Sequence, residues 1–155
     1  MELADILSEG SVVVCTGLKT KREVLEKLAE RAGQVTVQNA AAIFDCIYDR
    51  EVLGSTGLGN GIAIPHGKFA GVSGVTAIFA RLSDPVDFDS VDDQPVDLVM
   101  MLLAPMGAGA DHLKSLARVA RILRTESVVD ELRRAADAGR IYQILTRPMA
   151  ATQAA

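Results

Sequence analysis

Residues 50–68, REVLGSTGLGNGIAIPHGK, contain five glycines, one proline and one of the two histidines of the chain. Glycine allows positive φ angles and close backbone approach, so successive N–H groups in such a turn can converge on an anion. The spacing differs from GxGxxG and no GK[ST] follows, which argues against a dinucleotide fingerprint or a P-loop. We therefore expect an anion-binding turn, with Ser55, Thr56, Gly57 and Gly59 as the candidate donors.

His66 follows Pro65 at the end of Ile62-Ala63-Ile64, which is typical of a short strand. A neutral imidazole can attack with one nitrogen while a hydrogen bond holds the other. Arg50 lies three and four residues beyond Ile47 and Cys46 on the inner face of the preceding helix, so its cation points toward this region. Two interpretations stay open: His66 is a nucleophile beside an anion site, or it is a structural residue.

His112, the second histidine, comes one residue after Asp111, the expected cap of a helix. Free N–H groups and the helix dipole favour an anion at that position. One interpretation is an exposed first-turn residue. The other is a second imidazole at the same site, donating a hydrogen bond to a phosphoryl group.

The elements that must position these residues follow from hydrophobic periodicity and from capping signals. Thr20 and Glu23 form a capping box, and Gly33 is expected to end that helix. In the helix after Asp111, the expected inward residues are Leu113, Leu116, Ala117, Ala120 and Leu123. The predicted strands are 11–14, 62–64, 74–82 and 96–104, and the predicted helices are 20–33, 38–51, 111–123, 127–135 and 137–145.

Strands interspersed with pairs of helices predict an α/β fold, a single layered domain with helices on both sides of a sheet. The 155 residues suit one domain, and no repeat or linker divides them. We expect the domain to span residues 1–148 and residues 149–155 to form a frayed tail.

The composition argues against several classes of partner. A net charge of −4 and 4% aromatic residues disfavour a nucleic-acid surface. The longest apolar run, 98–104, is too short to span a membrane, and the acidic N-terminus lacks the basic region of a signal peptide. We therefore expect a cytoplasmic protein without membrane insertion, in which Cys15 and Cys46 are buried thiols.

A run of five aspartates lies between the third and fourth predicted strands, at positions 84, 87, 89, 92 and 93. These residues lack the regular ligand spacing and the closing glutamate of a calcium loop. We interpret the run as a solvated turn, and we expect neither a metal nor another cofactor.

The residues around both histidines also resemble a known family. Arg50, LGSTG at 53–57, GNGIAIPHG at 59–67, FDSVDDQPVDLV at 88–99 and HLK at 112–114 match the pattern of mannitol/fructose-class enzyme IIA domains. These domains belong to the bacterial phosphoenolpyruvate phosphotransferase system. Within the class, the chain most resembles the nitrogen-regulatory branch, IIA-Ntr, and the resemblance covers nearly the whole sequence.

The resemblance implies a central mixed β-sheet with helices on both sides. It implies that His66 accepts a phosphoryl group from the phosphohistidine of an HPr-like carrier of the NPr type. Arg50 would pair with the phosphoryl charge, and His112 would be the second histidine of the site. The glycine loop, with Ser55, Thr56, Gly57 and Gly59, could then cradle the group, and no metal is required. Which nitrogen of His66 reacts stays open.

The function that follows is a regulatory phosphocarrier, whose phosphorylation state decides which target proteins it binds. One alternative is a sugar-transport IIA that passes the group to a IIB domain, and another is a binding module that is never phosphorylated. A docking partner would require an apolar rim, for which Phe69, Leu58 and Met106 are candidates. The sequence does not indicate the oligomeric state.

Overall fold

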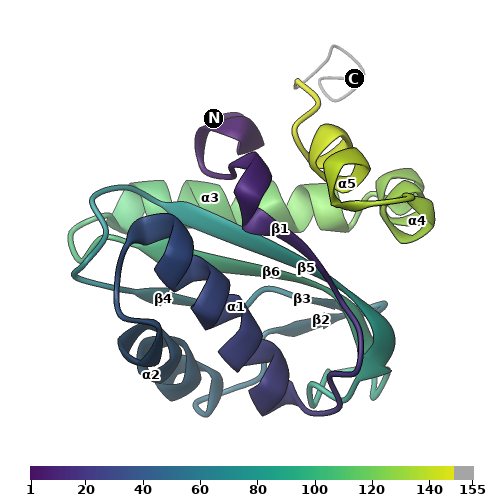
Figure 1. Ribbon diagram of the computed structural model, residues 1–155, viewed down its shortest axis with the longest axis horizontal. Coiled ribbons are helices and arrows are strands. Elements are labelled where there is room, and N and C mark those ends of the chain that lie inside the picture. The colour runs from purple at the N-terminus through teal and green to yellow at the C-terminus, as the bar shows by residue number, and fades with distance from the viewer. Residues whose placement is uncertain (149–155) are drawn as a thin grey trace.

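The computed structural model describes residues 1–148 (Figure 1). The predicted tail, 149–155, lies outside the described residues. The elements in chain order are η1 (Leu3–Asp5), η2 (Glu9–Ser11), β1 (Val12–Cys15), α1 (Lys21–Thr36), α2 (Ala40–Glu51), β2 (Gly57–Gly59), β3 (Ile62–Ala63), β4 (His66–Lys68), β5 (Thr76–Val86), β6 (Val96–Ala104), α3 (Gly109–Leu123), α4 (Glu126–Arg134) and α5 (Ala138–Leu145).

The strands form one mixed sheet in the order β1-β5-β6-β3-β2. β1 pairs in parallel with β5, β5 is antiparallel to β6, and β2 is antiparallel to β3. The short strands β3 and β4 both pair in parallel with β6, β3 at Leu98 and Val99 and β4 from Leu102 to Ala104. Eight of the nine residues of β6 are buried, as expected for a strand covered on both faces.

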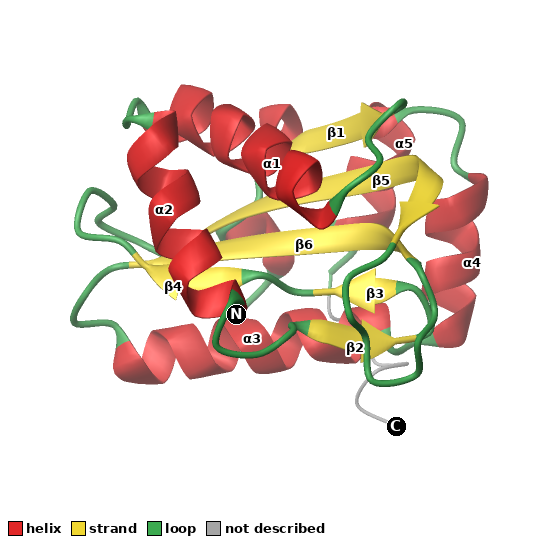
Figure 2. Ribbon diagram, turned by 90° about the horizontal axis from the view of Figure 1, so that it is seen from below, coloured by secondary structure: helices red, strands yellow, loops and turns green. Residues whose placement is uncertain are grey.

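Helices cover both faces of this sheet, which confirms the predicted α/β layering. α1 and α2 pack on one face, and α3 lies along the other with α4 and α5 beside it (Figure 2). The alternating side chains of β6 divide between the two cores: Val99 and Met101 face α1 and α2, and Leu98 and Met100 face α3. The mixed sheet that the resemblance implied is therefore confirmed as well.

The start of α1 is the predicted capping box, in which the hydroxyl of Thr20 accepts from the N–H of Glu23 and the Glu23 carboxylate accepts in return. The predicted end of this helix is wrong. Gly33 lies inside the helix, which continues to Thr36 and ends at Val37 with a φ of 55°. A Cβ at Gly33 would lie 2.9 Å from the carbonyl oxygen of Gln38, so this glycine permits the close return of the chain into α2.

The predicted start of α3 is also wrong, and its predicted inward face is wrong at Leu113 and Ala117. The helix begins at Gly109 with Ala108 as its N-cap, and Asp111 lies exposed in the first turn. Leu113, an expected core residue, is 67% exposed, whereas His112 and Ser115 are buried. Ala117 is likewise exposed, whereas Leu123 is buried and Leu116 and Ala120 are partly buried against the core, as expected.

Both cysteines are free thiols, Cys15 buried and Cys46 half-buried. Burial raises the pKa of each thiol, which lowers the fraction of reactive thiolate at neutral pH. Among residues 1–148, no helix is both long and apolar enough to cross a membrane.

Candidate functional site

His66 is the first residue of β4 and lies beside Leu102 of the central strand. Its Nδ1 is 2.8 Å from the carbonyl oxygen of Ile64. A carbonyl oxygen can only accept a hydrogen bond, so in the neutral ring Nδ1 carries the proton. Nε2 then holds the free lone pair, and His66 is half-buried. This hydrogen bond leaves Nε2 as the nitrogen that could act as a nucleophile, a choice that the sequence left open.

His112 lies next to His66, with 5.6 Å between the ring centroids and 54° between the ring planes. The two residues come from different elements, since His112 lies in the first turn of α3. His112 is only 8% exposed, and its Nδ1 has no hydrogen-bond partner within the described residues 1–148. The structure therefore brings both histidines of the chain to one place.

The pKa of His112 is lowered, first by burial and then by the positive charges of His66 and Lys68. The folded protein therefore holds this ring neutral under conditions in which the unfolded chain would bind a proton. A neutral imidazole still has one N–H to donate to an anion.

This pKa shift predicts an acid sensitivity with a defined sign. Because the folded pKa of His112 lies below the unfolded value, the unfolded state binds more protons as the pH falls through about 6.5. The free energy of unfolding should therefore decrease on acidification more steeply in the wild type than in His112→Asn. Urea titrations of both proteins at about pH 7.5 and pH 5.5 measure this difference. Equal losses in the two proteins would show that His112 contributes nothing to the acid sensitivity.

Arg50 lies in the last turn of α2 and is half-buried. One of its Nη atoms donates a hydrogen bond of 2.9 Å to the carbonyl oxygen of Gly54. α2 packs against β4, where a Cβ at Gly67 would lie 2.9 Å from Sγ of Cys46. Because Arg50 follows Cys46 by one helical turn, its side chain belongs to the helix face that borders β4.

The polar groups of Ser55 and Thr56, in the predicted anion-binding loop, form hydrogen bonds with other groups of the protein. The Ser55 hydroxyl donates to the carbonyl of Phe88 and accepts from the N–H of Gly57. The Thr56 hydroxyl and N–H both donate to the carboxylate of Glu51. These bonds stabilise the turn itself, and a direct role of residues 55–59 in holding an anion stays a prediction.

The glycine turn lies at the other end of β6 from His66. Ile62 pairs with Leu98 and His66 with Leu102, a separation of four residues or about 13 Å along the strand. Gly61, with a φ of 81°, is packed so closely that a Cβ would lie 2.5 Å from Nη2 of Arg133. The turn borders a cavity of about 720 Å³ between the 58–62 segment and α4. Close packing of the backbone therefore explains glycine at this position.

Sequence reasoning overlooked Glu51 and Lys21, which form a partly buried ion pair at the end of α2. Nζ of Lys21 is 2.8 Å from Oε2 of Glu51, whose side chain is 2% exposed. The only signal in the sequence is that Glu51 directly follows Arg50, and Lys21 reads as an ordinary residue of the capping box.

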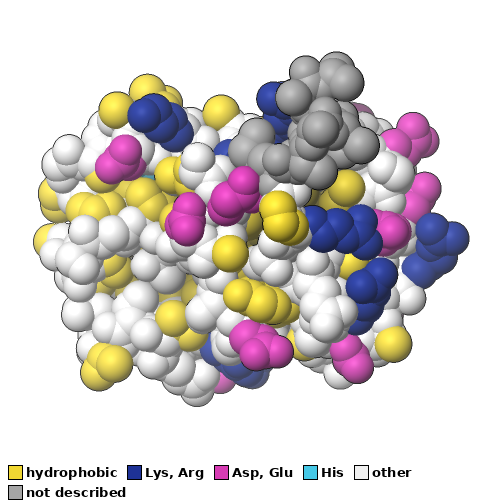
Figure 3. Space-filling model, turned by 90° about the horizontal axis from the view of Figure 1, so that it is seen from above, with side chains coloured by type: hydrophobic (Ala, Val, Ile, Leu, Met, Phe, Trp, Pro, Cys, Tyr) yellow, Lys and Arg dark blue, Asp and Glu magenta, His cyan; other side chains and the backbone are white. Residues whose placement is uncertain are grey.

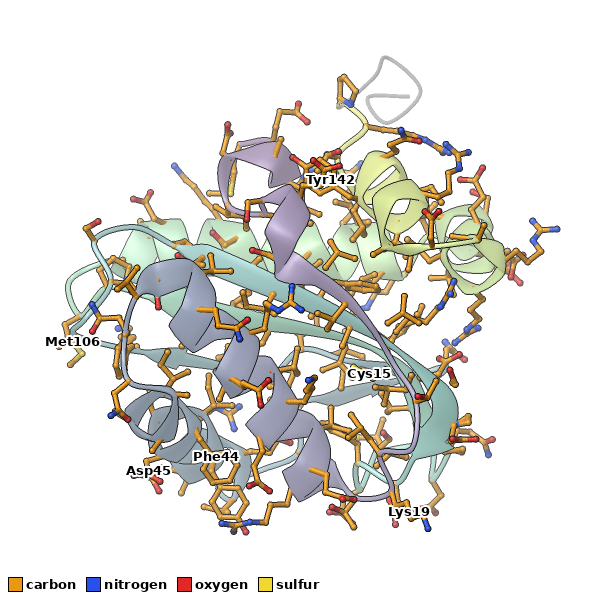
Figure 4. All side chains as sticks on the ribbon, viewed as in Figure 1. Cys15, Lys19, Phe44, Asp45, Met106 and Tyr142 are labelled. Carbon is orange, nitrogen blue, oxygen red and sulfur yellow. The ribbon has the colours of Figure 1, made fainter. Side chains whose placement is uncertain are left out.

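Exposed apolar side chains lie on the segments that carry the site. Met106, in the connection between β6 and α3, is 62% exposed and lies at the edge of the molecule (Figure 4). Leu113 on α3 and Leu53 just after α2 are also exposed. Phe69 and Leu58, the other two rim candidates, are partly buried against the two cores. Figure 3 shows hydrophobic side chains gathered at the end of the molecule where Figure 4 places Met106.

Within the described residues, no three histidine, cysteine, aspartate or glutamate side chains are arranged to hold a metal ion. Of the acidic run, Asp92 accepts hydrogen bonds from the N–H groups of Asn60 and Gln94. Asp89 lies 3.9 Å from Nζ of Lys21.

Comparison with known families covers almost the whole chain. Residues 5–147 match the family described as Phosphoenolpyruvate-dependent sugar phosphotransferase system, EIIA 2. The chain belongs to the EIIA type-2 family. This confirms the family that the residues around the histidines resemble, and it makes the chain a component of a phosphotransferase system.

Individual relatives agree with this assignment. A nitrogen regulatory protein of Bradyrhizobium diazoefficiens is 45% identical over 150 residues, covering 97% of this chain and 98% of that one. A fructose-specific EIIA component of Haloferax volcanii is 40% identical over 123 residues, covering 79% of each chain. The crystal structure of nitrogen regulatory protein IIA-Ntr from Neisseria meningitidis superposes with a TM-score of 0.87 at 35% identity, covering 93% of this chain and 99% of that one.

Proposed function

We propose that this EIIA type-2 protein is a regulatory phosphocarrier of the nitrogen branch of the phosphotransferase system. It accepts a phosphoryl group on Nε2 of His66 from the phosphohistidine of an HPr-like carrier of the NPr type. Its phosphorylation state then selects the target proteins that it binds. The observation that carries the proposal is the hydrogen bond from Nδ1 of His66 to Ile64, which leaves Nε2 free beside His112.

The transfer needs one bond to form and one to break. The lone pair of Nε2 attacks phosphorus, the N–P bond of the carrier breaks, and its electron pair returns to the carrier's imidazole. No proton has to leave Nε2, because the hydrogen of the neutral ring is on Nδ1. After transfer, the carbonyl oxygen of Ile64 accepts from Nδ1 of a ring whose other nitrogen is phosphorylated, which stabilises positive charge on that ring.

The protein's contribution is position and charge, since phosphoryl transfer depends on an in-line approach and on stabilisation of the equatorial oxygens. His112 supplies an N–H from 5.6 Å away, measured between ring centroids. Its burial makes that hydrogen bond stronger than it would be in water. Arg50 supplies a permanent charge with a fork of donors that matches phosphoryl oxygens.

A docking surface for the carrier is supported by the exposed Met106, Leu113 and Leu53. Leu113 directly follows His112, and Leu53 follows Arg50 by three residues. Apolar side chains around a charged centre are typical of transient protein interfaces. In this proposal, the exposed position of Leu113, which is unfavourable for the isolated domain, serves the partner.

A second candidate is supported by the fructose-specific relative at 40% identity. In that case the protein passes its phosphoryl group to a IIB domain during sugar uptake. A binding module without phosphorylation is the third candidate, and the free Nε2 of His66 argues against it.

The deciding experiment offers the protein phosphoenolpyruvate, the first enzyme of the system and one of two carriers, NPr or the sugar-branch HPr. We expect an acid-labile gain of one phosphoryl group by intact mass, formed faster with NPr. Faster transfer from HPr, with onward transfer to a IIB domain, would favour the sugar branch. If neither carrier gives an adduct, the binding module without phosphorylation is the remaining candidate function.

A further inference from the structure

Glu51, the last residue of α2, is a buried carboxylate for which the transfer chemistry has no direct use. It is 4% exposed, and both of its oxygens are bound. Oε1 accepts from the hydroxyl of Thr56 at 2.6 Å, and Oε2 accepts from the N–H of the same residue at 2.8 Å. A two-point contact of this kind fixes both the place and the orientation of Thr56.

The contacts continue from Thr56 to the ring of His66. The carbonyl oxygen of Thr56 accepts from the N–H of Ile64 at 3.1 Å. The carbonyl oxygen of Ile64 then accepts from Nδ1 of His66 at 2.8 Å. The two hydrogen bonds of Ile64 belong to different peptide groups, so this chain of contacts transmits position and does not relay charge.

The same turn also holds Arg50. Glu51 and Thr56 close a loop of six residues, and within it the carbonyl oxygen of Gly54 accepts from Arg50 at 2.9 Å. A shift of Thr56 would therefore move the segment that orients the guanidinium as well as the strand that orients the imidazole.

Lys21 of α1 also binds this carboxylate, with Nζ 2.8 Å from Oε2, the oxygen that accepts from the N–H of Thr56. Its ammonium group also lies 5.3 Å from the ring centroid of Phe88. Burying an ion pair often stabilises a protein no better than apolar residues of the same volume. A carboxylate is thus a costly way to fill this space, and its directed contacts with Thr56 are what an apolar side chain cannot replace.

We propose that Glu51, held by Lys21, is a positioning residue that sets the tautomer and orientation of His66 and the place of Arg50. The expected effect of Glu51 on the rate of phosphoryl transfer rests on the proposed phosphocarrier function. Its expected effect on the His66 ring does not. Glu51 itself does not touch the phosphoryl group.

The test compares Glu51→Gln and Thr56→Val with two controls. Thr56→Ser keeps the hydroxyl, and Glu23→Gln removes a helix-capping carboxylate that has no contact with Thr56, Ile64 or His66. Long-range proton–nitrogen NMR of the imidazoles, at about pH 8.5 where an ordinary histidine is neutral, reports the tautomer of His66. The His112→Asn background assigns its signals, because the chain has two histidines.

We expect the proton of His66 on Nδ1 in the wild type and in both controls, and a gain of the Nε2–H tautomer in Glu51→Gln and Thr56→Val. Transfer from the phosphorylated carrier should slow about tenfold in those two variants and stay near the wild-type rate in Glu23→Gln. If Glu51→Gln does not fold, Thr56→Val decides the matter.

Loss of thermal stability with an unchanged tautomer and rate would reduce Glu51 to a structural role and overturn the proposal. A tautomer shift in a protein whose wild type takes up no phosphoryl group would support the positioning role while the phosphocarrier function fails. Phosphorylation of the wild type with no tautomer change in any variant would support the phosphocarrier function and overturn the positioning role.

Discussion

The His66→Asn variant should fold like the wild type and lose all detectable phosphorylation. Asparagine keeps an N–H in the place of Nδ1, so the hydrogen bond to the carbonyl oxygen of Ile64 can form and β4 can pair with β6 as before. What the variant lacks is a nucleophilic nitrogen in the place of Nε2. Intact mass after incubation with phosphoenolpyruvate and the upstream proteins measures the effect.

His112→Asn is the matched control, since it makes the same replacement in the neighbouring ring. We expect it to be phosphorylated to the same final extent but about 10- to 100-fold more slowly, because it loses one donor to the phosphoryl oxygens. Phosphorylation of His66→Asn, or its transfer to His112, would contradict the assignment of the nucleophile.

The Arg50→Met variant should transfer the phosphoryl group about 100- to 1,000-fold more slowly, with its fold intact. Methionine retains much of the aliphatic packing of a half-buried arginine, and the hydrogen bond to Gly54 that it removes lies at the surface. Rapid-quench measurement of transfer from the phosphorylated carrier gives the rate.

Two further variants separate charge from geometry. Arg50→Lys keeps the charge without the fork of donors, so its rate should lie between those of the wild type and Arg50→Met. Arg124→Met, at the end of α3 beside the far cavity, removes an exposed arginine away from the histidines and should change nothing. A wild-type rate in Arg50→Met would mean that Arg50 serves only to hold the turn after α2.

Much of the fold was predictable because local patterns decide it. The span of β6 is confirmed residue for residue, since nine mostly apolar residues between polar turns leave few alternatives. The capping box at Thr20 depends on residues three apart in the sequence, and it is confirmed in the structure. The family itself was recognisable from one continuous segment and a few later residues.

The inward face of α3 was not predictable in the same way. Leu113 and Ala117 fit helical spacing as well as His112 and Ser115 do, and hydrophobicity favours the first pair. The short connection from β6 starts the helix before Asp111 and turns His112 inward, at the expense of an exposed leucine. We propose that Leu113 is exposed because it contacts a docking partner.

The sequence by itself determined the class of fold, the family and the residues that could do chemistry, because residue types, spacing and capping patterns are properties of neighbours along the chain. Only the tertiary structure decided which nitrogen of His66 is free and that His112 lies 5.6 Å from it by ring centroids. It also decided that Glu51 is tied through Thr56 and Ile64 to His66. It also placed the glycine turn at the far end of β6. The physical reason is that each of these features depends on contacts between separate segments, which local patterns do not specify.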